Sequence, residues 1–256
     1  MAPTVKEKHY FRLAYGVLAL AFWVSVAGFT YLMTRPNHSK EGAPWSAWRP
    51  ANDDLRGARE IAQRIAGRYK LDNGRQLVAI QEHPPQVQGL DLEAVGIRKT
   101  RRNGQVDPYI ALYGGRRTLI YAFCGLGRNC AIQEMSNEGI DHLLRREALE
   151  LSLYSFKYLD RVEQVVTLLP ATPGSSDTRS TAVFLRKEQF DDLLDRPLRQ
   201  ILPRATPPSP SQVDSSEANV VDALTARSTY PAEFEPLPDG DAILVLQLDT
   251  ADTASN

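Results

Sequence analysis

An uncharged segment, Leu13–Thr34, is the feature that most constrains this chain. As a helix rising 1.5 Å per residue it would be about 33 Å long, enough to cross the roughly 30 Å hydrocarbon core of a bilayer. Its four leucines, three valines and two phenylalanines each favour insertion by about 0.3–0.6 kcal/mol. We therefore expect a transmembrane helix over residues 13–34; the alternative is a buried helix of a soluble core.

The flanking charges predict the orientation of this helix. Lys6, Lys8 and Arg12 precede it, whereas only Arg35 and Lys40 follow closely. The positive-inside rule then keeps residues 1–12 cytoplasmic and places the rest of the chain outside the cytoplasm, as a single-pass protein of the cell membrane.

A cleaved signal peptide is the alternative to a signal anchor, because Ser25-Val26-Ala27 fits a small-x-small cleavage site. The apolar segment is longer than the roughly 7–15 residue core of a signal peptide and continues past this site, which favours the anchor.

Composition divides the rest of the chain. We expect a tether at 35–51, one α+β domain at 52–202, a Pro/Ser-rich linker at 203–218, a segment at 219–249 that returns a strand to the same domain, and a disordered tail at 250–256. In the tether, Trp45 and Trp48 either lie at the lipid headgroups or cap the domain core, and we favour the core. The net charge of −1 argues against a generally basic nucleic-acid-binding protein.

The first half of the domain reads as a helix followed by strands. Asn52 can cap a helix that ends at Asn73-Gly74. Strands are expected at 76–81, at 87–102 with a phase slip near Ala94, at 109–113 and at 118–123. Asn103-Gly104 is a strong hairpin signal, and Gly114-Gly115 suggests a second tight turn, so these strands are predicted to form an antiparallel meander.

The second half begins with a long helix at about 137–158. Strands at 162–169 and 181–185, helical turns at 189–202, a short helix at 219–227 and an apolar strand at 242–248 follow. The predicted fold class is α+β, with a mainly antiparallel sheet packed by two helices. Since residues 242–248 are too apolar to stay in water, we expect removal of everything after Leu202 to damage the domain and deletion of 206–215 to be tolerated.

Cys124 and Cys130 flank a five-residue loop on the expected outer side of the membrane. There a disulfide can persist, and a hairpin end places cysteines at bridging distance. We predict a disulfide between them; the alternative is two buried free thiols.

A basic cluster precedes the Asn103-Gly104 turn and consists of Arg98, Lys99, Arg101 and Arg102. Alternating hairpin turns would bring Arg128 to the same end of the meander. These side chains are either solvated turn charges or a docking patch for an acidic envelope protein, an anionic lipid or an anionic polymer.

Sequence signatures of catalysis are missing. The four histidines are scattered, and no metalloprotease, nucleophile-elbow, phosphate-loop or dinucleotide-binding motif occurs. We expect no catalytic residues, cofactor or metal. The opposing hypothesis is a hydrolase that assembles dispersed carboxylates such as Glu134, Glu138 or Asp141, and convergent acids with shifted pKa values in a cavity would favour it.

The segments GLGRNCAI (125–132), LLRREALELSLYSFKYL (143–159) and DRPLRQIL (195–202) resemble uncharacterised single-pass membrane proteins of actinobacteria. The resemblance implies an envelope location and no particular activity. The sequence as a whole therefore predicts a membrane-anchored interaction or accessory protein of the cell envelope.

Overall fold

The computed structural model describes residues 44–82, 86–87, 90–100, 106–114, 117–125, 132, 138–170, 180–202, 204–238 and 241–249. The expected membrane segment, most of the tether and the expected tail lie outside these ranges. Within them, no helix combines the length and apolar character needed to span a bilayer. From Trp45 on, the described chain forms one compact unit.

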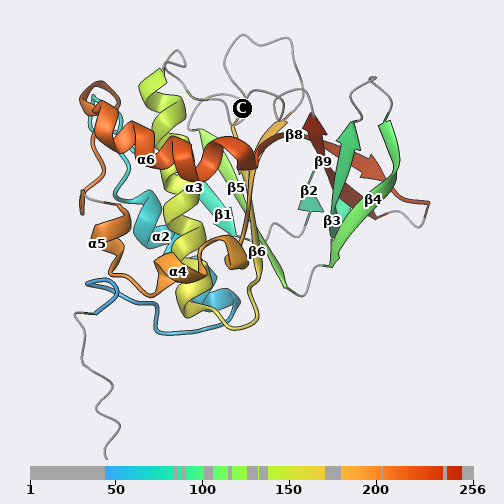
Figure 1. Cartoon of the computed structure of the whole chain (residues 1–256), viewed down its shortest axis with the longest axis horizontal. Coiled ribbons are helices and arrows are strands. Elements are labelled where there is room, and N and C mark those ends of the chain that lie inside the picture. The colour runs from blue at the N-terminus through green and yellow to red at the C-terminus, as the bar shows by residue number, and fades with distance from the viewer. Residues whose placement is uncertain are drawn as a thin grey trace, which may run out of the picture. The chain divides into compact units, whose positions relative to one another are not determined.

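This unit is an α+β domain built on a mixed, mostly antiparallel sheet (Figure 1). The strands are β1 (Val78–Glu82), β2 (Gln86–Val87), β3 (Leu90–Thr100), β4 (Val106–Gly114), β5 (Thr118–Gly125), β6 (Gln164–Leu169), β7 (Ser180–Arg186), β8 (Thr229–Pro236) and β9 (Ala242–Asp249). They run in the order β1-β5-β6-β7-β8-β9-β3, and β4 and β2 also pair with β3. β5 with β6 and β9 with β3 are parallel, and the other pairs are antiparallel.

The strands on either side of Asn103-Gly104 pair as predicted. β3 and β4 form an antiparallel ladder in which Val95 lies opposite Tyr113. The phase slip expected near Ala94 is also present, because the pairing of β3 with β9 shifts register between Leu92 and Ala94. Such a shift is what one extra residue in a strand produces.

The predicted meander does not continue beyond β4. β5 pairs with β1 and β6, and within the described residues it forms no ladder with β4. Thr118 Oγ1 donates a hydrogen bond to the carbonyl oxygen of Gly114 at 3.3 Å, so the start of β5 lies beside the end of β4 without pairing with it in the described part of the chain. Glycines permit many backbone conformations, and here Gly114-Gly115 does not mark a hairpin. The reason for placing Arg128 beside the Asn103-Gly104 turn therefore no longer holds.

The sheet curls over one of its faces. Tyr113 on β4 and Phe184 on β7 have ring centroids only 5.2 Å apart, although β8, β9 and β3 lie between these strands in the sheet order. Neighbouring strands are about 4.8 Å apart, so a flat sheet would separate them by roughly 19 Å. The enclosed face holds a small core of Val95, Ile120, Val166, Leu168, Ala182, Phe184, Ala232, Leu244 and Leu246.

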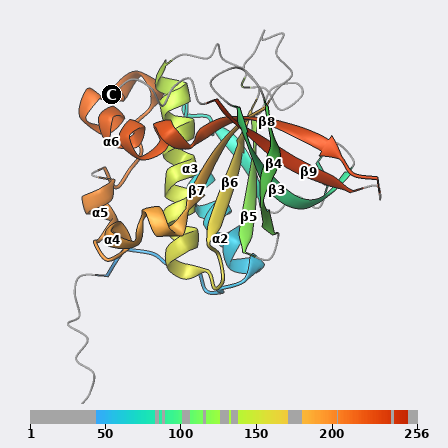
Figure 2. The same cartoon turned by 45° about the vertical axis from the view of Figure 1, so that its right-hand side comes forward.

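The larger core lies between the opposite face and two helices, α2 (Leu55–Ala66) and α3 (Glu138–Tyr158) (Figure 2). Alternate residues of β5 point into the two cores. Leu119 and Tyr121 belong to the core under the helices, and Ile120 belongs to the core on the curled face. α2 begins later than predicted, because Asp54 rather than Asn52 accepts the hydrogen bond from the Arg56 amide.

α2 also ends earlier than predicted, at Ala66 rather than at Asn73-Gly74, and Gly74 adopts a positive φ of 80° in the turn that follows. A close approach explains Gly57 within the helix. A Cβ there would lie 2.0 Å from the Asn52 carbonyl oxygen and 2.9 Å from Leu159.

Trp45 and Trp48 pack on the domain core, as we favoured. Trp45 makes edge-on contacts with Tyr154 and Tyr158, at centroid distances of 5.3 and 5.5 Å. Trp48 lies 5.7 Å from Tyr154. The Trp45 carbonyl also accepts a 2.7 Å hydrogen bond from the Leu198 amide. The end of the tether is thus part of the folded domain.

Short helices connect β7 to β8: α4 (Asp191–Leu194), α5 (Leu198–Ile201), α6 (Ser215–Thr225) and the 3-10 turns η2 (Lys187–Gln189), η3 (Pro210–Gln212) and η4 (Ala226–Ser228). The residues before α6, expected to be a linker, form a packed strap (204–214). Pro207, Pro208 and Pro210 are buried in it, and Ser211 donates a 2.6 Å hydrogen bond to Asp72. We therefore no longer expect deletion of 206–215 to be tolerated.

Candidate functional site

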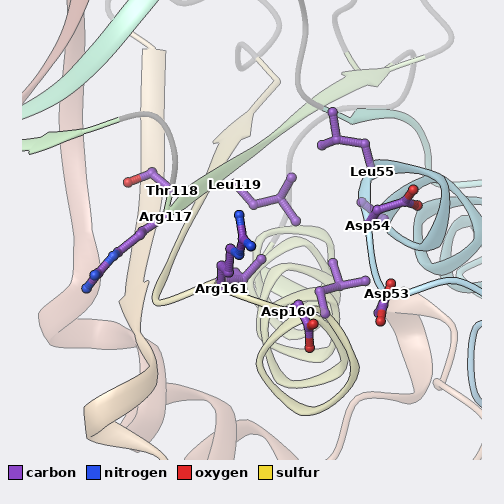
Figure 3. A pocket seen from close by; sticks show the side chains of 11 residues that line it. Asp53, Asp54, Leu55, Arg117, Thr118, Leu119, Asp160 and Arg161 are labelled. Carbon is purple, nitrogen blue, oxygen red and sulfur yellow. The ribbon is translucent and has the colours of Figure 1, made fainter.

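A cavity of about 310 Å³ opens at the N-terminal end of α2 (Figure 3). Three segments that are far apart in sequence form its walls: the start of α2, the start of β5, and the turn after α3. The lining residues are Asp53, Asp54, Leu55, Ala58, Arg117, Thr118, Leu119, Leu159, Asp160, Arg161 and Val162. The cavity therefore combines an apolar floor with charges of both signs.

Backbone hydrogen bonds hold the three walls together. The Asp160 amide donates to the Asp53 carbonyl oxygen at 2.9 Å, which ties the turn after α3 to the start of α2. The Glu163 and Gln164 amides donate to the Arg117 carbonyl oxygen at 2.9 and 3.1 Å, which ties the same turn to β5. Because these contacts involve main-chain atoms, the cavity is already formed without a ligand, as most small-molecule sites are.

Two of the charged lining residues are engaged in ion pairs. Asp54 caps α2 and pairs with Arg56, and hydrogen bonds from Arg56 lower the pKa of the Asp54 carboxyl. Arg117 donates a 2.7 Å hydrogen bond to Glu163. A general acid needs a raised pKa, so Asp54 is unsuited to that role.

A second polar cluster is buried between α3, α6 and the strap. Arg146 is fully buried, and its guanidinium donates to Glu217 and to the Tyr69 hydroxyl, both at 2.5 Å, and to Glu150 at 3.3 Å. It also donates to the Arg204 carbonyl oxygen of the strap at 2.8 Å. Tyr69 in turn donates to Glu150 at 2.7 Å. Since these contacts satisfy the guanidinium and join several segments, we interpret the cluster as a structural clamp.

Glu147 lies beside this clamp and differs from its neighbours. It is fully buried, and neither carboxyl oxygen has a hydrogen-bond partner among the described residues. Burial, and then the nearby Glu150 carboxylate, raise the pKa of Glu147 well above its usual value, with Arg146 opposing. Glu147 therefore keeps its proton to a higher pH in the folded protein than an ordinary glutamate does.

Replacing Glu147 by Gln is expected to stabilise the protein by an amount that grows with pH between the ordinary glutamate pKa and the raised native pKa of Glu147. An unfolded glutamate has a pKa of about 4.3. Between that pH and the raised native pKa, the native state retains a proton that the unfolded state has released, so stability falls with rising pH by up to about 1.4 kcal/mol per pH unit. An amide does not titrate in this range, so Glu147→Gln would remove the slope. Urea unfolding of both proteins at a series of pH values above 5 measures the difference, in which the contributions of groups that titrate alike in both proteins cancel.

Glu138→Gln is the matched control, because Glu138 is exposed on the same helix. A difference between Glu147→Gln and the unsubstituted protein that stayed constant with pH would contradict a raised native pKa.

The structure describes only some of the sequence-predicted site residues. Arg98 forms a bidentate pair with Glu235, at 2.6 and 2.8 Å, so its charge is neutralised within the domain. Arg101, Arg102 and Arg128 lie outside the described residues, as does the side chain of Lys99. The docking patch therefore stays a hypothesis.

Cys124 lies near the end of β5, opposite Ala79 of β1, whereas Cys130 is outside the described residues. The disulfide remains a prediction. Of the dispersed carboxylates, Glu138 and Asp141 are exposed in the first turn of α3 and do not line the cavity; Glu134 is not described. Sequence reasoning missed the cavity, and no motif in its three segments indicated it.

The chain matches no protein-family model, no curated protein and no solved structure at a significant level. The function therefore has to be argued from the sequence and from the geometry of the site. Among the described residues, no group of His, Cys, Asp and Glu side chains is arranged to hold a metal ion.

Proposed function

We propose that this chain is a membrane-anchored interaction or accessory protein of the bacterial cell envelope, with residues 1–12 in the cytoplasm and the α+β domain outside it. The observation that carries the proposal is the 22-residue segment 13–34, uncharged throughout and preceded by Lys6, Lys8 and Arg12. The resemblance to actinobacterial single-pass proteins is consistent with the same location.

The cavity supports binding rather than catalysis as the role of the domain. It has fixed walls and a mainly apolar floor, and these features suit the capture of a ligand. Of its three lining acids, Asp53, Asp54 and Asp160, Asp54 is engaged as a helix cap with a lowered pKa. The hydrolase hypothesis requires convergent acids with raised pKa values in a cavity, and the buried Glu147, whose pKa is raised, does not line this one.

A topology reporter tests the location. Alkaline phosphatase fused after Asn256 is expected to be active, because the enzyme needs its disulfides and forms them only outside the cytoplasm. The same reporter fused after Arg12, without the apolar segment, should be inactive. Alkaline extraction of membranes should leave the full chain in the pellet if residues 13–34 are inserted and uncleaved. An inactive Asn256 fusion that is expressed at the same level would refute the proposed location.

A further inference from the structure

The cavity in Figure 3 contains three charged side chains that are not neutralised within the described part of the protein. Asp54 and Arg117 have the partners Arg56 and Glu163. By contrast, the side chains of Asp53, Asp160 and Arg161 form no hydrogen bond or ion pair among the described residues. Among the described residues, the cavity thus presents two carboxylates and one guanidinium without an ion-pair partner, and all three side chains are exposed to solvent.

These charges lie on different sides of the cavity. Figure 3 shows Asp53 beside the start of α2 and Asp160 over the end of α3, whereas Arg161 extends toward Leu119 and the start of β5. The hydrogen bond from the Asp160 amide to the Asp53 carbonyl oxygen keeps these two acidic residues together. A ligand in the cavity therefore meets negative charge on the α2 side and positive charge on the β5 side.

Arg161 is held in an unfavourable backbone conformation. Its φ of 63° makes it the only non-glycine residue with a positive φ in the described part of the chain. For a residue with a Cβ, the left-handed region costs roughly 1–2 kcal/mol. Glycine would turn the chain here without that cost, and such strain often accompanies a functional side chain. We therefore attribute the presence of an arginine at this position to a function of its guanidinium group.

Apolar side chains complete the cavity. Leu119 forms part of the buried core, and Leu55 is 55% exposed, one of the few large apolar side chains so exposed in the described structure. Val162 is half-buried beside them. Because Leu119 is only 3% exposed, an apolar group placed here would remove mainly the surface of Leu55 from water, which is favourable by about 25 cal/mol per Å².

We infer that the cavity binds a small zwitterion of the α-amino acid type that carries an apolar side chain. The ligand's ammonium group faces Asp53 and Asp160, its carboxylate pairs with Arg161, and its side chain covers Leu55 and Leu119. A volume of about 310 Å³ is at the small end of the range for ligand sites, roughly 300–1,000 Å³, and suits a single amino acid. This inference rests on the proposed binding role and supplies its ligand class.

Titration calorimetry on the detergent-solubilised full chain tests the inference with three probes. L-leucine has both charges, N-acetyl-leucine lacks the ammonium and leucinamide lacks the carboxylate. We expect L-leucine to bind and each blocked form to bind at least tenfold more weakly. No heat of binding with L-leucine, or equal binding of N-acetyl-leucine, would overturn the zwitterion site.

Arg161→Gly separates binding from folding. It removes the guanidinium and relieves the positive φ, so L-leucine should bind at least tenfold more weakly while the melting temperature stays the same or rises. Asp53→Asn should also weaken L-leucine binding, and Arg199→Gln, at an exposed position on α5, should not. Unchanged leucine binding by Arg161→Gly would refute the assignment. A negative result leaves the membrane location standing, since the phosphatase reporter does not depend on this cavity.

Discussion

A chain that ends at Leu202 is expected to lose the cooperative unfolding of the domain and most of its solubility. The truncation removes α6, β8 and β9. β8 and β9 lie between β7 and β3, so the sheet would be divided into two parts. The fully buried Val221, Leu244, Val245 and Leu246 would be lost, and burial of four such side chains is worth roughly 6–12 kcal/mol. That is comparable with the whole net stability of a domain, about 5–15 kcal/mol.

The matched control is a chain that ends at Asp249, the last residue of β9, which should unfold like the full protein. Far-ultraviolet circular dichroism during urea unfolding, together with the soluble fraction after expression, measures both chains. A soluble chain ending at Leu202 with an unchanged unfolding transition would mean that β8 and β9 are not integral to the domain.

Local sequence patterns predicted those elements that a short stretch of sequence specifies by itself. The helical periodicity at 137–158 corresponds to α3, and the slip near Ala94 corresponds to the register shift in β3. The strand at β8 was missed because Pro231 and Pro236 interrupt it. Proline cannot donate to a ladder and therefore argues against a strand.

The sequence did not indicate how elements that are far apart in the chain pack together. Gly114-Gly115 is compatible with a hairpin or with a bend, and only the curl of the sheet decides between them. The proline-rich strap reads as a linker because it has few apolar side chains, yet its prolines are buried. Proline loses little conformational entropy on folding, so such a segment packs at low cost.

The cavity could not be predicted for a related reason. Its walls come from residues near positions 54, 118 and 160, and no short motif connects them. The positive φ of Arg161 gives no signal in the sequence either, since arginine is not a typical residue for that conformation. In the sequence, Asp53 follows the predicted cap Asn52 and fits the first turn of a helix, so its place at a cavity emerged from the structure alone.

The clamp around Arg146 leads to the other large expected effect. In sequence, charged residues on α3 suggest a solvated face, whereas Arg146 and Glu150 are buried under α6 and the strap. Arg68 also pairs with Glu150 at 2.5 Å, and Arg204 lies 3.5 Å from Glu217. Removal of Arg146 takes the fully buried cation away from Glu150 and Glu217 and leaves them only the partly exposed Arg68 and Arg204. Breaking a buried pair in this way costs about 3–5 kcal/mol.

Arg146→Ala is therefore expected to lower the unfolding free energy by about 3–5 kcal/mol. Arg117→Ala is the control, because the Arg117–Glu163 pair has side chains 66% and 46% exposed and such pairs contribute only about 0–1 kcal/mol. Urea unfolding at pH 7 gives both values.

If Arg146→Ala does not fold, the triple variant Arg146→Met, Glu150→Gln, Glu217→Gln shows whether unpaired charge or lost packing causes the loss of stability. It removes the guanidinium and both carboxylates while keeping similar volumes. The charges that remain nearby belong to Arg68 and Arg204, whose side chains are 25% and 43% exposed and can be solvated. The triple variant should regain a large part of the stability lost in Arg146→Ala, because the penalty arises from unpaired buried charge rather than from lost packing. A triple variant less stable than the single one, or a loss below about 1 kcal/mol in Arg146→Ala, would show that the buried charges do not hold α3, α6 and the strap together.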